Sequence, residues 1–340
     1  MANNNFEFKE LIDFKNTSYD LGNNFQLVQA AGGNTSIKSE NTMLIKASGT
    51  WLINSKKDDI FVELDLASIK NKIKMSKEDN FVEDIMSNNN LRPSTETSFH
   101  GLINFKYVLH AHSTTTIANS IFHESKNLLK DKLGEHIVYV PYIRPGFPLT
   151  MLMKNLIKND TRIIILENHG LIVAGDNLND TYNLLLETHN KLDNVINQYD
   201  IDINIDKVLT IPKYIQKNDN KYQIFKTKNE NLLSVFSKSF YPDHVIFLGP
   251  GIPLLNSPDD AKKFILEISK KNFKLPPYII IKNYGLYENI EAISAAKEML
   301  DCFIEILLRI DFNYTPKTLS KEQENELLNW DAEIYRQTIN

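Results

Sequence analysis

The sequence is poor in cysteine and in charge of one sign. Cys302 is its single cysteine, which excludes a disulfide framework and a cysteine-based zinc site. The 38 basic and 43 acidic residues give a net charge of −5, and no basic stripe interleaved with aromatics points to nucleic acid as a partner. No uncharged apolar run reaches the roughly 18 residues of a membrane helix, and the N-terminus lacks an apolar signal-peptide core. We therefore expect a soluble, cytoplasmic protein that contacts neither nucleic acid nor membrane.

The apolar residues that are present suffice for a folded protein. Hydrophobic residues make up 42% of the chain, charged residues 24% and aromatic residues 10%, which is typical of a globular protein. A length of 340 residues is enough for one large domain with an appendage, or for two domains.

Short apolar segments with strand character alternate with helical segments. The predicted strands are Met43–Ala47, Tyr107–His110, Ile137–Val140, Ile163–Leu166, Val245–Leu248 and Tyr278–Ile281. Helices are predicted after Pro93–Glu96, near Asp180, from Ser257, and as a long amphipathic segment that runs through Ile310. This alternation predicts an α/β fold in which helices cover a central sheet.

The composition changes after residue 200, where Lys, Asn and Asp dominate. We therefore predict a domain at 1–200, a linker or crossover at 201–234, and a C-terminal α/β segment at 235–340. Residues 163–170, Ile-Ile-Ile-Leu-Glu-Asn-His-Gly, are echoed at 278–285 by Tyr-Ile-Ile-Ile-Lys-Asn-Tyr-Gly. Either the echo is a coincidence, or the C-terminal segment is a degenerate structural repeat in which Tyr284 stands where His169 stands and binds no metal.

The pair His110 and His112 is the most informative feature. Side chains alternate between the faces of a strand, so both imidazoles project to one side while Leu109 and Ala111 face the other layer. Two imidazoles in this arrangement can fill two corners of a tetrahedral zinc site. The alternative is a pair of surface or hydrogen-bonded histidines without a metal.

A third ligand must come from another of the eight histidines. His169 follows an apolar strand and precedes Gly170, at the rim of the sheet where ligand groups of open α/β sheets gather. It could instead be a capping histidine bonded to the backbone. His100 is interpreted as a buttress for a neighbour, and no functional role is expected of His123, His136, His189 and His244. Three histidines leave a position open on zinc, as in catalytic sites.

Glu96 is the candidate general base, in the first turn of the predicted helix, where the alternative is simple capping because an acid there is favoured by the helix dipole. Three segments have the composition of oxyanion-binding loops: residues 31–36, residues 46–50, and the helix start at Ser94 and Thr95. Glycines let the backbone approach an anion, and hydroxyl and amide groups donate hydrogen bonds to it. Lys46 would either add a positive charge or lie at a strand edge in water.

Five segments together resemble the class II aldolase/adducin family, in the family's order, over about residues 20–200. They are Gly32–Ser36, Ile45–Thr50, Pro93–Glu96, His110–His112 and Asn168–Gly170. The run Ser-Thr-Glu-Thr-Ser-Phe-His ending at His100 is most similar to the aldolase part of bifunctional rhamnulose-1-phosphate aldolase/dehydrogenases. The resemblance implies a three-layer α/β/α fold with a central mixed, largely antiparallel sheet, and a smaller C-terminal α/β segment.

The resemblance also implies roles for individual residues. It makes His110, His112 and His169 the ligands of one Zn²⁺, or another divalent metal, per chain. Glu96 matches the acid/base of the aldolases, whereas the family's epimerases have an aspartate there. The substrate phosphate would be bound by the residues that match the family's phosphate loops: Asn34, Ser48, Gly49, Ser94 and Thr95. No residue can be matched to the acid that protonates the leaving aldehyde.

These implications predict a zinc-dependent aldolase that cleaves or forms a C–C bond in a ketose 1-phosphate through a metal-stabilised enediolate. A decarboxylase, dehydratase or 4-epimerase acting on a phosphorylated sugar stays open, as do an enzyme for a non-phosphorylated substrate and a non-catalytic adducin-like interaction protein. The expected partners are a small phosphorylated sugar or aldol substrate and further copies of the chain, in a homo-oligomer that the resemblance makes a tetramer. No Gly-x-Gly-x-x-Gly fingerprint follows a strand, so no nicotinamide cofactor and no residue to bind one are expected.

Overall fold

The computed structural model describes residues 6–78, 80–87, 89–193, 196–197, 199 and 209–339, and the chain divides into two compact units. The first unit comprises Met1–Asn194 with Trp330–Asn340, and the second comprises Val195–Asn329. Within the described residues, no helix has both the length and the apolarity needed to cross a membrane. Each unit is described separately below.

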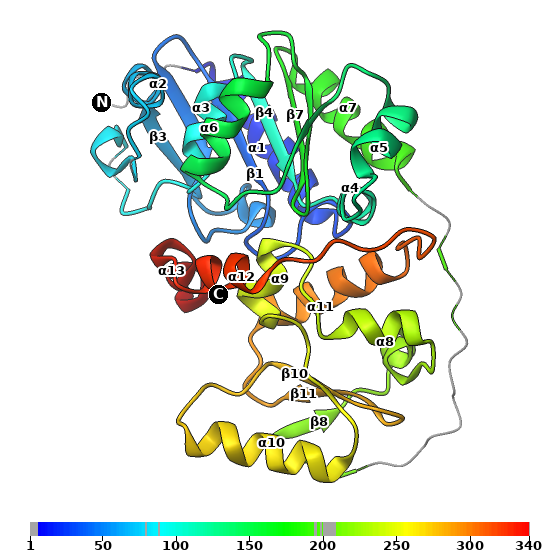
Figure 1. Cartoon of the computed structure of the whole chain (residues 1–340). Coiled ribbons are helices and arrows are strands. Elements are labelled where there is room, and N and C mark those ends of the chain that lie inside the picture. The colour runs from blue at the N-terminus through cyan, green and yellow to red at the C-terminus, as the bar shows by residue number, and fades with distance from the viewer. Residues whose placement is uncertain are drawn as a thin grey trace. The chain divides into compact units, whose positions relative to one another are not determined.

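The first unit is built on a seven-stranded sheet in the order β3-β2-β1-β4-β7-β6-β5 (Figure 1). Its strands are β1 (Asn34–Lys38), β2 (Thr42–Lys46), β3 (Phe61–Asp65), β4 (Tyr107–Ala111), β5 (Val138–Val140), β6 (Ile163–Leu166) and β7 (Gly170–Gly175). Neighbouring strands are antiparallel except β5 and β6, which are parallel. The prediction of a mixed, largely antiparallel sheet is confirmed.

Helices cover both faces of this sheet. The helices of the first unit are α1 (Phe8–Asn23), α2 (Leu66–Lys74), α3 (Thr97–Leu102), α4 (Thr114–Ser120), α5 (Ser125–Leu133), α6 (Phe147–Leu156), α7 (Leu178–Lys191) and α13 (Asp331–Ile339). Leu109 and Ala111 of β4 belong to a core cluster with side chains of α1, α5 and α7. Val108, on the opposite face, packs in a cluster with α3 and α6. The three-layer α/β/α prediction is therefore confirmed.

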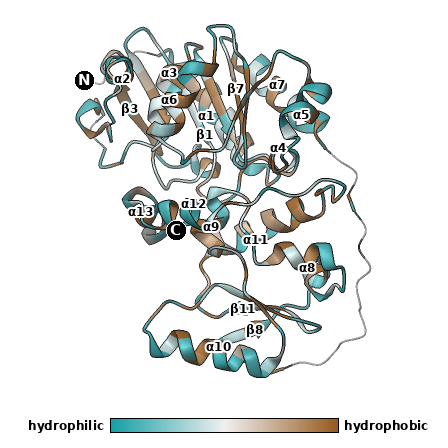
Figure 2. Ribbon diagram, in the orientation of Figure 1, coloured by the Kyte–Doolittle hydropathy of each residue, from teal (hydrophilic) through white to brown (hydrophobic). Residues whose placement is uncertain are grey.

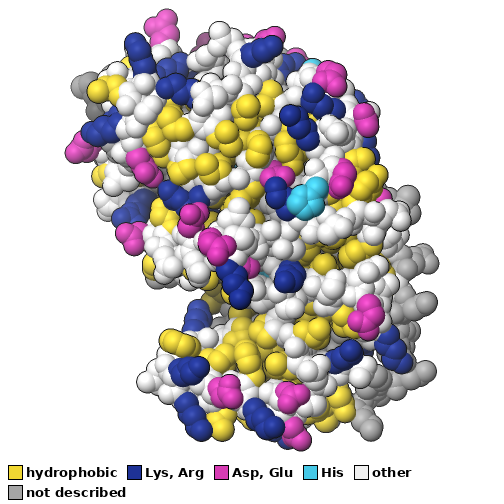
Figure 3. Space-filling view, in the orientation of Figure 1, with side chains coloured by type: hydrophobic (Ala, Val, Ile, Leu, Met, Phe, Trp, Pro, Cys, Tyr) yellow, Lys and Arg dark blue, Asp and Glu magenta, His cyan; other side chains and the backbone are white. Residues whose placement is uncertain are grey.

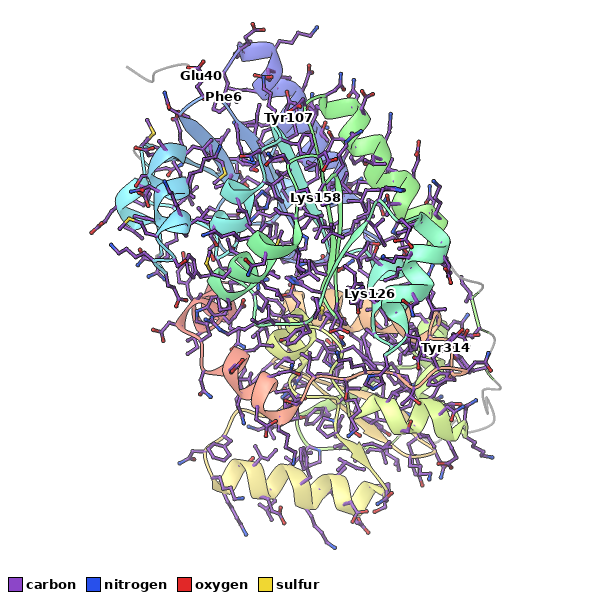
Figure 4. The ribbon with its side chains drawn as sticks, turned by 45° about the horizontal axis from the view of Figure 1, so that its top comes forward. Phe6, Glu40, Tyr107, Lys126, Lys158 and Tyr314 are labelled. Carbon is purple, nitrogen blue, oxygen red and sulfur yellow. The ribbon has the colours of Figure 1, made fainter. Side chains whose placement is uncertain are left out.

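Apolar runs explain why the strands lie where they do. Strand β6 is buried along its whole length, because helices cover both faces of the sheet and a continuous apolar run is stable there. Figure 2 shows the hydrophobic colour concentrated along the strands of the sheet. Figure 4 marks Tyr107 at the start of β4, where its hydroxyl donates to Glu10 Oε1 over 2.7 Å.

The second unit holds a four-stranded sheet in the order β8-β11-β10-β9. Its strands are β8 (Tyr214–Gln216), β9 (Leu254–Leu255), β10 (Tyr278–Ile281) and β11 (Gly285–Asn289). Its helices are α8 (Glu230–Phe236), α9 (Pro242–Leu248), α10 (Pro258–Lys270), α11 (Ser294–Leu307) and α12 (Lys321–Leu328). Short 3-10 helices lie at Leu52–Asn54 and Val82–Asp84 in the first unit and at Asn220–Lys226 in the second. Helix α10 begins as its sequence predicts, because Ser257 caps it by accepting from the Asp260 amide.

The structure differs from one strand prediction in this region. The strand predicted at Val245–Leu248 is wrong, because these residues end helix α9, which has Pro242 in its first turn and is buried throughout. A short apolar run does not by itself distinguish a buried strand from a buried helix. In the predicted linker or crossover, residues 209–234 contain β8, a 3-10 helix and the start of α8, while 201–208 lie outside the described residues. Residues 330–340 group with the first unit.

The two sheets share a pattern of strands. In the first unit β4, β7 and β6 are antiparallel neighbours and β5 is parallel to β6; in the second, β8, β11 and β10 are antiparallel and β9 is parallel to β10. His110 pairs with the residue two positions after Gly170, and Gln216 pairs with the residue two positions after Gly285. This correspondence supports the proposal that the second unit is a degenerate structural repeat, with Gln216 where the first unit has His110.

Candidate metal and substrate site

The end of strand β4 presents two imidazoles on one face. His110 lies on β4 and His112 directly follows it; both are buried. His110 Nδ1 lies 3.1 Å from the carbonyl oxygen of Leu171 on β7. A carbonyl oxygen only accepts hydrogen bonds, so Nδ1 carries the proton and a neutral ring keeps its lone pair on Nε2. This contact fixes the ring so that Nε2 points into the site.

The turn between β6 and β7 brings in the third imidazole. Asn168 adopts a left-handed conformation with φ 54°, which asparagine tolerates better than most residues, and His169 follows it. A Cβ at Gly170 would lie 2.3 Å from the backbone oxygen of Ala111, so a residue with a side chain does not fit between this turn and β4. The ring centroids of His110 and His169 are 5.0 Å apart, and those of His112 and His169 are 5.1 Å apart.

Glu96 faces the same space from the start of helix α3. It occupies the N-cap position, but its side chain makes no capping hydrogen bond. Its Oε1 instead lies 3.3 Å from Nε2 of His110 and 4.0 Å from Nε2 of His169. The capping interpretation of Glu96 is therefore wrong, and its carboxylate belongs to the histidine cluster.

Electrostatics keep the Glu96 carboxyl ionised. Burial alone would raise its pKa, but positive charge on the imidazoles of His110 and His169 outweighs burial and holds the pKa well below the usual range. Burial also lowers the pKa of His100 well below its usual value, and its Nδ1 lies 2.7 Å from the Ser36 hydroxyl of β1. A neutral, hydrogen-bonded His100 at 0% exposure agrees with its interpretation as a buttress.

The four side chains match the donor set of a metal site. One ligand atom from each of Glu96, His110, His112 and His169 lies within 4.8 Å of the others, and all four residues are buried. Three imidazoles with one position left for a substrate or water are typical of catalytic zinc. The orientation of His110, with its outer nitrogen bonded to a carbonyl, is the arrangement that metal-ligating histidines adopt. The residues present therefore fit a zinc ion.

Hydrogen bonds join the three loops that were expected to bind phosphate. Asn34 Nδ2 donates to Ser94 Oγ over 2.8 Å, and the Ser48 amide donates to the carbonyl of Arg92 over 3.0 Å. Lys46 is buried rather than in water. Its Nζ donates to the carbonyls of Ala31, at 3.0 Å, and Thr50, at 2.8 Å. Lys46 therefore holds the two glycine-containing loops together.

A cavity of about 420 Å³ opens beside these loops, within the first unit. Its walls include Ser48, Ser94 and Thr95 of the expected phosphate set. Asn34 donates a hydrogen bond to the wall residue Ser94. Gly49 follows Ser48 in the chain and has a left-handed φ of 75°. The same cavity is lined by residues that the sequence did not predict: Arg92, Gly146, Trp330 and Tyr335. Arg92 directly precedes Pro93 and could have been suspected as a cation beside an anion loop, whereas nothing in the sequence pointed to the C-terminal pair.

Comparison with known proteins agrees with this geometry. Residues 16–193, more than half of the chain, match the family described as Class II Aldolase and Adducin N-terminal domain. L-fuculose phosphate aldolase of Methanocaldococcus jannaschii is 28% identical over 182 residues, which cover 51% of this chain and 87% of that protein. The uncharacterized oxidoreductase YuxG of Bacillus subtilis is 28% identical over 202 residues, which cover 53% of this chain but only 29% of that protein. The chain thus spans less than a third of the length of YuxG.

Among solved structures, the N-terminal class II aldolase domain of a conserved protein from Thermoplasma acidophilum has a similar fold. The TM-score is 0.50 at 23% identity, and the alignment covers 55% of this chain and 93% of that one. The expected class II aldolase fold of the first unit is therefore confirmed.

Proposed function

Because the chain belongs to the class II aldolase and adducin family, we propose that it is a zinc-dependent aldolase that forms or cleaves a C–C bond in a ketose 1-phosphate. The observation that carries this proposal is the buried cluster of Glu96, His110, His112 and His169. Adducin-like interaction domains have no need of such a cluster, since burying a carboxylate among three imidazoles is costly without a function.

In this proposal His110, His112 and His169 hold the zinc ion. When bound, zinc supplies a Lewis acid that polarises the carbonyl of the substrate. The protein orients the ligands: the Leu171 carbonyl orients the ring of His110, and the left-handed turn at Asn168 orients His169. These contacts fix the imidazoles before the substrate arrives.

Glu96 moves the proton. Its ionised carboxylate removes a proton from the carbon beside the carbonyl in the direction of synthesis and returns it in the direction of cleavage. A carboxylate is a weak base toward a C–H bond, so it can act only on a carbon whose neighbouring carbonyl is strongly polarised. Proton transfer therefore depends on the metal ligands being intact.

The loops beside the cluster position the substrate. Asn34, Ser48, Gly49, Ser94 and Thr95 would bind the phosphate, and the cavity that three of them line, about 420 Å³, is large enough for a small sugar phosphate. Ser94 and Thr95 immediately precede Glu96, so binding the phosphate there fixes the distance between the anchored end of the substrate and the base.

Metal analysis of the purified protein beside H110A tests the proposal. We expect about one zinc ion per chain in the unaltered protein and loss of that ion in H110A, because a catalytic site needs all three imidazoles. The unaltered protein should condense dihydroxyacetone phosphate with lactaldehyde. Undiminished metal in H110A would remove the ligand assignment, and decarboxylation or epimerisation of a sugar phosphate in place of condensation would favour the related enzymes of the family.

A further inference from the structure

Arg92 differs from every other arginine of this chain in its partners. The other four arginines each contact an oxygen atom: Arg144 on Glu78, Arg162 on the Ala174 carbonyl, Arg309 on Glu305 and Arg336 on Glu333. Among the residues that the structure describes, none offers the Arg92 guanidinium a hydrogen bond or an ion pair. Its side chain is exposed to water, and no carboxylate of the described residues pairs with its charge.

This charge lines the cavity that holds the expected phosphate residues. Arg92 shares the walls with Ser48, Ser94 and Thr95, and its carbonyl accepts a hydrogen bond from the Ser48 amide at 3.0 Å, so the two loops are joined. Serine and threonine hydroxyls are neutral donors. A phosphate carries nearly two negative charges at neutral pH, and neutral donors alone leave those charges without a counter-ion.

A ring of helix α13 contacts the Arg92 guanidinium. The carbon at the centre of that guanidinium lies 4.5 Å from the ring centroid of Tyr335, a cation–π contact. Such a contact uses none of the N–H donors as hydrogen-bond donors, so they stay available for two parallel hydrogen bonds to an oxyanion. Arg144 is held similarly, 4.4 Å from the Trp330 ring, but its charge is already paired with Glu78.

The carboxylates of the cavity wall do not cancel Arg92. Glu78 and Asp331 both line the cavity. Glu78 lies 3.5 Å from Arg144, so its charge is balanced. Asp331 is exposed, in the first turn of α13, where water and the helix dipole stabilise a carboxylate.

We propose that Arg92 binds the phosphate group of the substrate through the edge of its guanidinium, and that Tyr335 is the positioning residue that holds it there. This inference rests on the proposed function and adds a specificity determinant to it, since a cation with two parallel donors selects phosphorylated over unphosphorylated substrates.

Binding of inorganic phosphate to the full-length, metal-loaded protein tests the proposal without any turnover. Titration calorimetry should show that R92Q binds phosphate about tenfold to a hundredfold more weakly, the range expected for lost charge-assisted hydrogen bonds. R92K should recover only part of that loss, because an ammonium ion is a point charge that cannot form the two parallel bonds. R92Q and R92K should retain their zinc.

Two further variants separate charge from packing. The double variant E78Q/R144Q removes the neighbouring arginine, which contacts Trp330 just before α13, together with the carboxylate that this arginine balances. We expect its phosphate affinity to stay within about twofold of the unaltered protein; a loss as large as that of R92Q would assign the effect to the docking of α13 and overturn the role of Arg92. Y335A should weaken phosphate binding and Y335F should restore it, because only the ring is needed. Failure of Y335F to restore binding would overturn the role of Tyr335.

The outcomes also distinguish this inference from the proposed function. Weaker phosphate binding by R92Q in a protein that shows no condensation would leave the inference standing while the aldolase proposal fails. Condensation by the unaltered protein together with unchanged phosphate affinity in R92Q would overturn the inference alone. Arg92-dependent binding of malonate but not of phosphate would likewise overturn it, because the anion would then be a carboxylate.

Discussion

The buried contact between His110 Nδ1 and the Leu171 carbonyl links the fold to its chemistry at the scale of one residue. The sequence pattern His-Ala-His indicates that two imidazoles share a face, but it says nothing about their tautomers. The register of β4 against β7 places Leu171 beside His110, and this pairing of distant segments determines which nitrogen is free for a metal.

Glu96 is the residue whose role is easiest to test in isolation. We expect E96Q to retain its zinc and to lose turnover by about 10²-fold or more, because an amide cannot accept a proton from carbon. Metal content and condensation rate should be measured on the same preparation, with phosphate affinity as the control. Turnover close to that of the unaltered protein would remove Glu96 from the mechanism.

His244 gives a prediction about stability and pH. Burial lowers its pKa from 6.5 to about 3, so the folded protein keeps this ring neutral while the unfolded chain protonates it below about pH 6.5. Stability contributed by His244 is therefore present above pH 6.5 and is lost as the pH falls, by about 1.4 kcal/mol per pH unit.

Replacing His244 with phenylalanine tests this. Its ring lies 4.6 Å from that of Phe303 and 5.5 Å from that of Tyr241, so an aromatic ring suits the position. Between pH 6.5 and 4.5 the unaltered protein should lose about 2–3 kcal/mol more unfolding free energy than H244F in urea titrations. Loss of metal at low pH affects both proteins and cancels in the difference. Identical pH slopes would contradict the prediction.

At the scale of elements, short apolar runs were the easiest part of the fold to predict. The strands expected at Ile163–Leu166 and Tyr278–Ile281 are β6 and β10, because each is a short apolar run that leads into an asparagine turn. Their hairpin partners β7 and β11 were not predicted, nor were β1, β3, β8 and β9. In the case of β1, Asn34–Lys38 has the composition of a loop. It becomes a strand because it pairs with both β2 and β4, which local sequence does not encode.

Gly170 shows how such a hairpin depends on one missing side chain. We expect G170A to push the β6–β7 turn away from β4, because the new Cβ would meet the Ala111 oxygen at 2.3 Å, and to reduce both zinc content and thermal stability. The matched control is G285A in the second unit, whose Cβ would meet only the flexible Lys226 side chain, at 2.9 Å. G285A should retain its zinc despite strain at a φ of 89°. Equal zinc content in the two variants would contradict the prediction.

At the scale of the whole molecule, the sequence singled out the four residues that the structure brings together as a candidate metal site, but it did not predict the complete cavity. Those four residues lie in motifs that carry their own signal. Trp330 directly precedes helix α13 and Tyr335 lies on it, and this segment comes only after the chain has passed through the second unit. On the face shown in Figure 3, charges of both signs are interspersed and no large patch of one sign forms. Surface charge therefore gave no further guidance to the site.

Removing residues 330–340 tests whether the candidate metal site and the phosphate-binding cavity depend on different segments of the chain. The truncated protein should keep its zinc, because Glu96, His110, His112 and His169 all lie outside the deleted segment. Its affinity for phosphate should fall about tenfold or more, since Arg92 would lose the ring that holds it. Metal analysis and calorimetry measure the two effects independently, and unchanged phosphate affinity would show that α13 takes no part in binding.

The position of α13 in the sequence has a consequence for biosynthesis. A ribosome delivers every proposed zinc ligand by residue 169, yet Tyr335 emerges only after the second unit has been synthesised. A nascent chain could therefore capture its metal well before it acquires the aromatic ring that orients Arg92. The proposed metal site would therefore assemble before the proposed phosphate-binding arginine is positioned, because the residues of the two sites follow one another along the chain.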